Sequence, residues 1–182
     1  LDGLSHLSYR GYDSAGVAVM EDGRIAVRKS QGKLDRLEAL LENHPVSGTL
    51  GIGHTRWATH GEPSDVNAHP HTDLQGGIAV VHNGIIENHE ALRRHLESTG
   101  ARFVSQTDTE VIAHLLYSLY NGNMRQTIMQ AMSMMQGSYA IGVICSQEPD
   151  TLYCARNDSP LVAGFRDGAG YIASDIPALL GY

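Results

Sequence analysis

The sequence has few cysteines, no dense cluster of positive charge and no long apolar run. Its 182 residues include two cysteines, Cys145 and Cys154, which is too few for a disulfide scaffold, so we expect a reducing, cytoplasmic setting. The formal net charge of −7 argues against nucleic acid and anionic membranes as partners, because both reward dense positive charge. No apolar run approaches the roughly 18 residues of a membrane span.

Both ends of the sequence also lack the residues that usually terminate a structural element. Leu1, Leu4 and Leu7 repeat at near-helical spacing with no Met and no capping residue before them, and residues 179–182 end the chain on an apolar stretch. We therefore expect a longer protein on both sides. The chain itself is long enough for one domain that buries roughly 70% of its unfolded surface.

Hydrophobic periodicity predicts antiparallel strands with helices packed on them. Strands are expected at 15–20 and 24–29 around an Asp22-Gly23 turn, at 51–54 and 77–81, and as a meander at 138–145, 151–155, 161–165 and 170–173. Helices are expected at 33–42, at 87–98, after a Thr107-x-x-Glu110 capping box, and at 124–136. In the last of these, we interpret the stripe of Ile128, Met129, Met132 and Met135 as core packing. Hairpins around adjacent helices are typical of an α+β layered domain.

The most informative feature is an apolar strand that runs into Asn83 and Gly84. An Asn side-chain NH2 and a Gly backbone N–H can aim two donors at one point, as an acyl-transfer site needs. Asn-Gly is also the strongest short signal for a hairpin turn, and the two residues alone favour that alternative. The chain continues with a helical pattern instead of a returning strand, so we interpret the pair as a candidate oxyanion hole.

Two residues of opposite charge are suited to the head group of an amino acid. Arg56 follows a predicted strand and can fork two hydrogen bonds onto a carboxylate. Asp108 lies at a predicted helix start and can accept from an ammonium group. Taken singly, each has an ordinary alternative that we prefer without further information: a solvated or salt-bridged loop arginine, and an N-cap aspartate.

Histidines and cysteines raise two further possibilities, both of which we disfavour. His69 and His71 have no third and fourth ligand nearby in the sequence, so we expect no metal site. Cys145 lies in an apolar strand with no cationic neighbour to lower its pKa, so we interpret it as a core residue and not as a nucleophile. His60 and His82 flank the candidate site and are suited to orienting its loops.

Five motifs occur together in this order: YRGYDSAG (9–16), GHTRWATHG (53–61), NAHPH (67–71), VHNGIIEN (81–88) and TDTEVIAH (107–114). Through them the chain resembles, over nearly its whole length, the glutaminase domain of glutamine:fructose-6-phosphate aminotransferases, which are class II glutamine amidotransferases. The resemblance implies a four-layer αββα sandwich of antiparallel sheets, of the N-terminal-nucleophile hydrolase type. It also implies that residues 1–182 are a glutaminase domain that lacks its N-terminal strand with the nucleophilic Cys, its C-terminal end and the separate isomerase domain.

The resemblance also implies roles for individual residues. The Asn83 side chain and the Gly84 N–H would form the oxyanion hole, while Arg56 would hold the α-carboxylate of glutamine and Asp108 its α-amino group. Further substrate-site residues would be Thr59 and His60 in the loop, Trp57 at the exit for ammonia, and Arg10 near the nucleophile. The implied ligands are L-glutamine and L-glutamate, with fructose 6-phosphate bound only by the isomerase domain of a homo-oligomer and with no cofactor.

Two classes of function remain open. One is the glutaminase half of an enzyme, which releases ammonia from glutamine through a γ-glutamyl thioester. The other is a binding module that holds glutamine or glutamate without chemistry, because its nucleophile is missing. The glutaminase domain of another class II amidotransferase is a further alternative.

Overall fold

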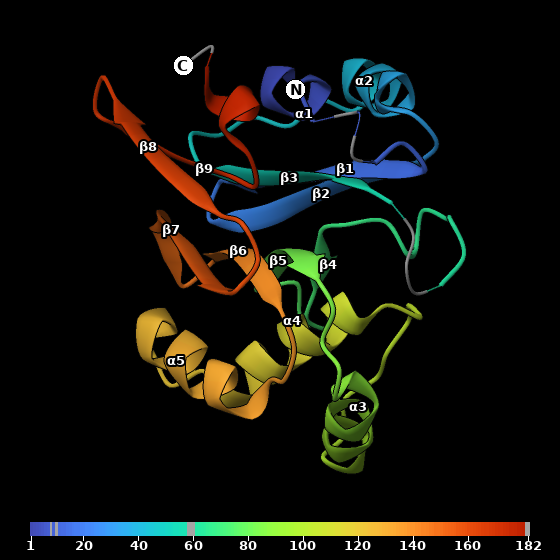
Figure 1. The fold of residues 1–182 in the computed structure, drawn as a ribbon, viewed down its shortest axis with the longest axis vertical. Helices are drawn as coiled ribbons and strands as arrows, with labels where there is room; N and C mark the ends of the chain where they lie inside the picture. Colours follow the sequence, from blue (N-terminus) through green and yellow to red (C-terminus); the bar gives the residue numbers. More distant parts are fainter. Residues whose placement is uncertain (8, 10, 58–60, 181–182) are drawn as a thin grey trace.

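Two antiparallel sheets lie face to face between two layers of helices in the computed structural model, which describes residues 1–7, 9, 11–57 and 61–180 (Figure 1). The helices α1 (Asp2–Ser5) and α2 (Leu34–Asn43) cover the outer face of one sheet. The helices α3 (His89–Ser98), α4 (Asp108–Leu119) and α5 (Met124–Met134) lie beyond the other sheet. This arrangement confirms the α+β, four-layer αββα sandwich.

The first sheet contains β1 (Ser14–Glu21), β2 (Arg24–Gln31) and β3 (Gly51–Arg56) in the order β2-β1-β3. The turn between β1 and β2 is the expected Asp22-Gly23 pair. Both residues have positive φ, 49° and 76°, as the tightest hairpin turns require.

The second sheet contains β4 (His71–Thr72), β5 (Ile78–Gly84), β6 (Tyr139–Cys145) and β7 (Glu148–Asn157) in the order β4-β5-β6-β7. Pro149, which we expected between strands, lies within β7. A proline is tolerated there because β7 is an edge strand.

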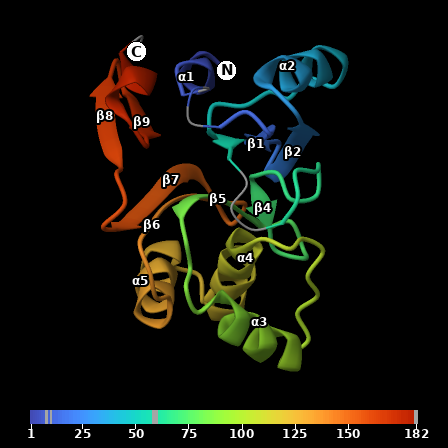
Figure 2. The same ribbon diagram turned by 45° about the vertical axis from the view of Figure 1, so that its right-hand side comes forward.

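The prediction of one C-terminal meander is wrong. The strands β8 (Val162–Arg166) and β9 (Ala169–Ala173) form a separate hairpin, followed by the short helix η2 (Ile176–Leu179). Asp158, directly after β7, has a positive φ of 62°, which ends the extended conformation and turns the chain away from the second sheet. Figure 2 shows the hairpin standing apart from β6 and β7, beside α1.

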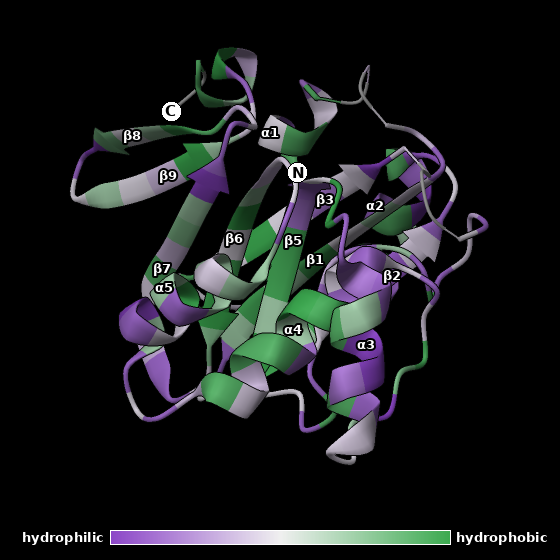
Figure 3. Cartoon of the chain, turned by 60° about the horizontal axis from the view of Figure 1, so that its bottom comes forward, coloured by the Kyte–Doolittle hydropathy of each residue, from purple (hydrophilic) through white to green (hydrophobic). Residues whose placement is uncertain are grey.

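The core has two parts of different size. Small and β-branched side chains, Ala18, Ile52, Ala79 and Ile144, pack between the sheets. The larger part lies between the second sheet and its helices, where α4 buries apolar residues along most of its length. Figure 3 shows α4 as largely hydrophobic and α3 as largely hydrophilic, because α4 lies centrally on the sheet.

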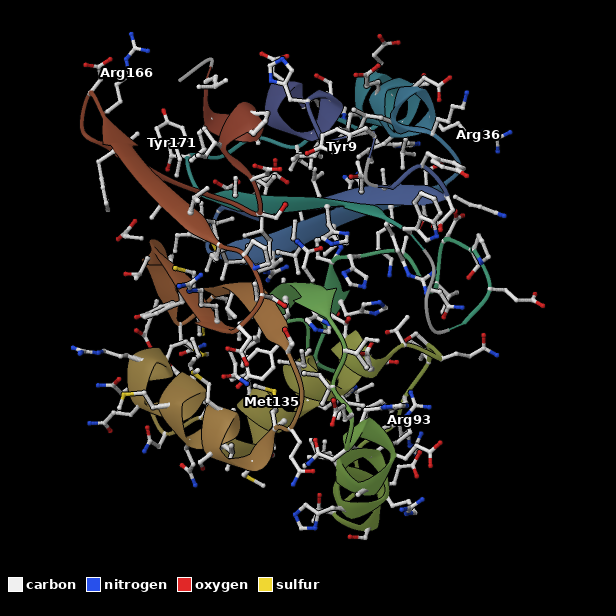
Figure 4. All side chains as sticks on the ribbon, in the orientation of Figure 1. Tyr9, Arg36, Arg93, Met135, Arg166 and Tyr171 are labelled. Atoms are coloured by element: carbon white, nitrogen blue, oxygen red, sulfur yellow. The ribbon has the colours of Figure 1, made fainter. Side chains whose placement is uncertain are left out.

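The Met stripe of α5 is only partly confirmed as core packing. Ile128 and Met135 are buried, and Met135 lies between α5 and the second sheet (Figure 4). Met129 is 63% exposed; it follows Ile128 directly, and consecutive residues of a helix point about 100° apart. Met132 is partly buried.

The capping box at the start of α4 is half confirmed. The Thr107 hydroxyl accepts a hydrogen bond from Glu110 N at 3.3 Å. The Glu110 carboxylate accepts instead from Val104 N at 2.9 Å and from Ser105 N at 2.7 Å, so it fixes the preceding loop and not the cap itself. Within the described ranges, no helix is both long and apolar enough to cross a membrane.

Candidate active site

A cleft of about 680 Å³ opens where the ends of β3 and β5 meet the start of α4. Five predicted site residues line it: Arg56, Trp57, Asn83, Gly84 and Asp108. They lie on or directly after three elements separated along the chain, so the fold brings together groups that the sequence only suggested singly. The rest of the lining is mostly apolar and comes from α1, β1, β9 and η2 among others.

Asn83 is a strand residue and not part of a hairpin turn. It pairs with Ala140 of β6, and Gly84 pairs with Tyr139. Alternate residues of β5 face opposite sides, so Val81 packs between the sheets while Val80 packs toward the helices. Asn83 shares the side of Val81 and lies against the first sheet, at the cleft.

Gly84 occupies a position that only glycine fits. Its φ is +121°, and a Cβ added there would lie 2.1 Å from the carbonyl oxygen of Ser138. The close passage of the 138–139 backbone therefore requires the absence of a side chain at the end of β5.

The Asn83 carboxamide is held from the opposite sheet. The Nε2 atom of His54 on β3 lies 3.0 Å from Asn83 Oδ1. His54 was not among the predicted site residues. The available signal was its spacing, since His54 and Arg56 are two residues apart on one strand and so face the same side.

Arg56 is a buried residue and not a solvated loop arginine. It is the last residue of β3 and is 4% exposed. Its Nη2 donates to the carbonyl oxygen of Gly61 at 3.2 Å. Burial lowers the pKa of the guanidinium, and the nearby carboxylates of Asp13 and Asp108 act in the opposite direction. An arginine still keeps its charge in such a setting, because its ordinary pKa is so high.

Asp108 is the first residue of α4, so the N-cap alternative is wrong; the N-cap is Thr107. The Asp108 side chain is buried, and its Oδ2 accepts from the backbone N–H of Ile86 at 2.9 Å. In the part of the chain that the structure describes, the other oxygen, Oδ1, has no hydrogen-bond donor. A carboxylate at this helix N-terminus is favoured by the helix dipole.

Trp57 follows Arg56 at the rim of the cleft and is 60% exposed. Its ring meets that of Tyr12 edge to face, with centroids 5.4 Å apart. The remaining predicted contacts, Arg10, Thr59 and His60, lie outside the described residues.

Four histidines surround the base of the site: His69, His71 and His82, which are buried, and His54, which is half-buried. Desolvation is the largest cause of the lowered pKa of each one. The pKa of His71 is lowered to about 3 and that of His82 to about 4. The hydroxyl of Thr109 bridges His82 Nδ1 at 2.9 Å and His69 Nε2 at 3.1 Å. The ring of His82 is thus held against α4, behind the site.

Both histidines of the pair His69 and His71 contact hydroxyl groups. His69 Nε2 lies 3.1 Å from the Thr109 hydroxyl, and His71 Nε2 lies 3.0 Å from the Thr107 hydroxyl. Among the described residues no group of three or more His, Cys, Asp or Glu side chains is placed to hold a metal ion. The side chains of His69 and His71 thus contact hydroxyl groups at the start of α4.

Neither thiol is placed as a nucleophile. Cys145 is 1% exposed within β6, and burial raises the pKa of its thiol, which confirms it as a core residue. Cys154 lies on β7, and no cysteine is among the described residues that line the cleft.

Comparison with known proteins identifies the family and the fold of the chain. Residues 54–181 match the family described as glutamine amidotransferase domain. The isomerizing glutamine–fructose-6-phosphate aminotransferases of Clostridium acetobutylicum and Clostridium tetani are 54% and 56% identical over 182 residues, which is all of this chain. The chain spans 30% of the length of each of these curated relatives.

The fold has a clear counterpart among solved structures. The glutamine phosphoribosylpyrophosphate amidotransferase of B. subtilis, complexed with ADP and GMP, matches 97% of this chain at 29% identity with a TM-score of 0.83. The chain covers 39% of that structure. This similarity confirms the expected fold of the N-terminal-nucleophile hydrolase type. The chain belongs to the glutamine amidotransferase family.

Proposed function

We propose that this chain is the glutaminase domain of a glutamine:fructose-6-phosphate aminotransferase and that it hydrolyses the side-chain amide of L-glutamine. The observation that carries the proposal is the placement of Asn83, Gly84, Arg56 and Asp108 on one cleft. Asn83 and Gly84 form a donor corner, a pair of hydrogen-bond donors that can stabilise the reacting carbonyl oxygen of an amide. Arg56 and Asp108 carry the opposite charges that can bind the zwitterionic head of an amino acid.

Binding of glutamine would rest on the two charges. The Arg56 guanidinium would donate to the α-carboxylate, and Asp108 would accept from the α-ammonium group through Oδ1. Both side chains are largely withdrawn from water, so each ion pair would form in a setting where screening is weak. Trp57 at the rim would help to cover the bound substrate, with Arg10, Thr59 and His60 as further contacts.

The chemistry requires a thiol at the cleft. Because Cys145 and Cys154 lie elsewhere, we propose that the nucleophile is a cysteine outside residues 1–182, at an N-terminus whose α-amino group serves as base. Attack of the sulfur on the amide carbon would move the carbonyl electrons onto oxygen, where Asn83 Nδ2 and Gly84 N would stabilise the negative charge. Departure of ammonia leaves a thioester, which water cleaves to glutamate.

In the whole protein, the ammonia would pass to a fused isomerase domain and be transferred to fructose 6-phosphate. That step, the cytoplasmic setting and the homo-oligomeric state belong to the proposal, which rests on the similarity to relatives named for this reaction. No cofactor is needed for the amide hydrolysis, because the thiol and the oxyanion donors supply all of its groups.

The test is Asn83→Ala in the natural protein that contains this chain. We expect kcat for glutamine hydrolysis to fall about 100- to 1,000-fold with KM nearly unchanged, because the oxyanion exists only along the reaction path. The matched control is Asn43→Ala on α2, whose side chain contacts its own helix at the Ala39 carbonyl oxygen. It should leave both constants unchanged.

Two outcomes would contradict the proposal. An effect of Asn83→Ala confined to KM would make Asn83 a substrate contact. Binding of glutamine without hydrolysis by the unaltered protein would favour the binding module. In addition, loss of turnover in Cys145→Ala with the fold intact would place the nucleophile on β6 and overturn our choice of an outside cysteine.

A further inference from the structure

His54 joins the two sheets directly beneath the proposed oxyanion donors. It lies on β3 of the first sheet, and its Nε2 reaches Asn83 Oδ1 on β5 of the second at 3.0 Å. No other hydrogen bond of the Asn83 side chain is present among the described residues. This contact therefore decides which way the carboxamide faces.

A carboxamide has two ends of nearly equal size and opposite polarity. Only the NH2 end can donate to a developing oxyanion, and a half-turn about the last torsion would present the oxygen instead. An oxygen facing the oxyanion would repel it. The proposed role of Asn83 thus depends on a partner that distinguishes the two ends.

We propose that His54 is a positioning residue for glutamine hydrolysis, which donates its Nε2 proton to Asn83 Oδ1 and so keeps the Asn83 NH2 group directed into the cleft. This inference rests on the proposed function of the cleft. His54 acts through Asn83 and makes no contact with substrate in this assignment.

The surroundings of His54 favour the Nε2 tautomer. The residue is half-buried. Within the described residues its buried Nδ1 has no partner in hydrogen-bonding geometry, although the backbone of His82 acts on the ring as a hydrogen-bond acceptor that raises the pKa of His54. A neutral imidazole carries one proton. On Nε2 the proton meets the Asn83 oxygen at 3.0 Å, whereas on Nδ1 it would have only the His82 backbone, which lies outside hydrogen-bonding geometry.

Burial keeps the ring neutral, because it lowers the pKa of His54, and the positive charge of Arg56 acts in the same direction. The hydrogen bonds to Asn83 and to the His82 backbone, and the charge of Asp13, act in the opposite direction and are outweighed by burial. A neutral His54 ring has one N–H donor and carries no charge, so it is a suitable hydrogen-bond partner for the uncharged amide oxygen of Asn83.

The ring of His54 is itself held in place. It stacks on the ring of His69 with centroids 4.4 Å apart and planes tilted by 31°. His69 in turn bonds the hydroxyl of Thr109, the residue after Asp108. The orientation of Asn83 and the position of the head-group carboxylate are therefore set by one buried cluster, as preorganised catalysis requires.

The test uses His54→Leu and His54→Gln in the natural protein that contains this chain. Leucine removes the donor, and we expect kcat for glutamine hydrolysis to fall about 10- to 100-fold with KM changed less than about twofold, since Asn83 loses its fixed orientation. Glutamine has an NH2 that can donate to Asn83 Oδ1, so His54→Gln should recover most of the lost rate. The control is His114→Gln, a buried histidine that pairs with Glu110 on α4 and should leave kcat unchanged.

A double-mutant cycle separates positioning from a general loss of structure. If His54 acts through Asn83, adding His54→Leu to Asn83→Ala should produce no further fall in kcat, because the group that it positions is gone. Multiplicative effects of the two changes, or wild-type kcat in His54→Leu, would overturn the inference.

A second measurement does not depend on activity. The 15N chemical shifts of His54 in the unaltered protein report its tautomer, and we expect the proton on Nε2. A proton on Nδ1 would overturn the inference even in an active enzyme. If the unaltered protein does not hydrolyse glutamine, the proposed function fails, and the tautomer alone still decides whether His54 fixes the Asn83 amide.

Discussion

Asp108 Oδ2 accepts a hydrogen bond from the backbone N–H of Ile86 at 2.9 Å, two residues beyond Gly84. The carboxylate that we assign to the substrate ammonium therefore also fixes the segment that follows the donor corner of Asn83 and Gly84. Under the proposed function, binding of the head group and stabilisation of the oxyanion would therefore be linked through one side chain.

Two substitutions at Asp108 should separate these tasks. Asp108→Asn keeps an oxygen that can accept from Ile86 N but removes the charge, so KM for glutamine should rise roughly 10- to 100-fold with kcat little changed, as expected for a lost charged hydrogen bond. Asp108→Ala removes the contact with Ile86 as well, and we expect an additional fall in kcat. Equal kinetic constants for the two variants would contradict the linkage.

Arg56→Lys tests the proposed contact with the α-carboxylate. A lysine ammonium cannot reproduce the planar fork of a guanidinium, so glutamate and glutamine should bind more weakly, by about 1–3 kcal/mol. Isothermal titration calorimetry with glutamate measures this without turnover. The control is Arg36→Lys on α2, an exposed position of the same chemistry away from the cleft. Unchanged affinity in Arg56→Lys would remove Arg56 from the substrate site.

Much of the fold followed from local patterns in the sequence. The turn at Asp22-Gly23 and the helix α2 were placed correctly because backbone conformation and amphipathic spacing are encoded by adjacent residues. The separate β8–β9 hairpin was not predicted, because two strands of the same composition can pair with a sheet or only with each other. That choice depends on where the chain turns after β7.

The site was harder to predict because its residues become distinctive only through distant packing. Singly, Arg56 and Asp108 favoured a loop arginine and an N-cap, and only their burial on one cleft shows otherwise. The contact between His54 and Asn83 crosses from one sheet to the other. No local pattern reports which residues of two facing sheets will meet.

Gly84→Ala should destabilise the protein through steric overlap as well as backbone strain. The added Cβ would lie 2.1 Å from Ser138 O at a φ of +121°, so we expect a loss of at least about 3 kcal/mol in the free energy of unfolding. Gly76→Ala is the matched control, since Gly76 also has a positive φ, +68°, but nothing lies within 4 Å of its Cβ position. It should cost only about 1 kcal/mol. Urea titrations of both variants measure how much free energy of unfolding each one loses. Equal losses would show that the backbone at Ser138 moves enough to avoid the overlap with the added Cβ.

The buried histidines predict that the protein loses stability in mild acid. The pKa of His71 is lowered to about 3 and that of His82 to about 4, chiefly by burial, whereas an unfolded histidine titrates near 6.5. As the pH falls, these histidines therefore bind protons in the unfolded chain before they bind them in the folded protein. The stabilisation is complete above about pH 7.5 and is lost as the pH falls through 6.5 toward the folded values.

Between pH 8 and pH 5, each of these two histidines should lower the free energy of unfolding by roughly 2 kcal/mol. Glu110, whose pKa is lowered to about 2, contributes a loss only below the usual carboxylate range and so falls outside this window. Urea titrations across the window measure the slope. His71→Gln should remove the contribution of one histidine, so the free energy of unfolding should fall less steeply with decreasing pH. His95→Gln, at an exposed position of α3, should leave this dependence unchanged. A free energy of unfolding that stays constant from pH 8 to pH 5 would mean that His71 and His82 accept protons within the folded protein.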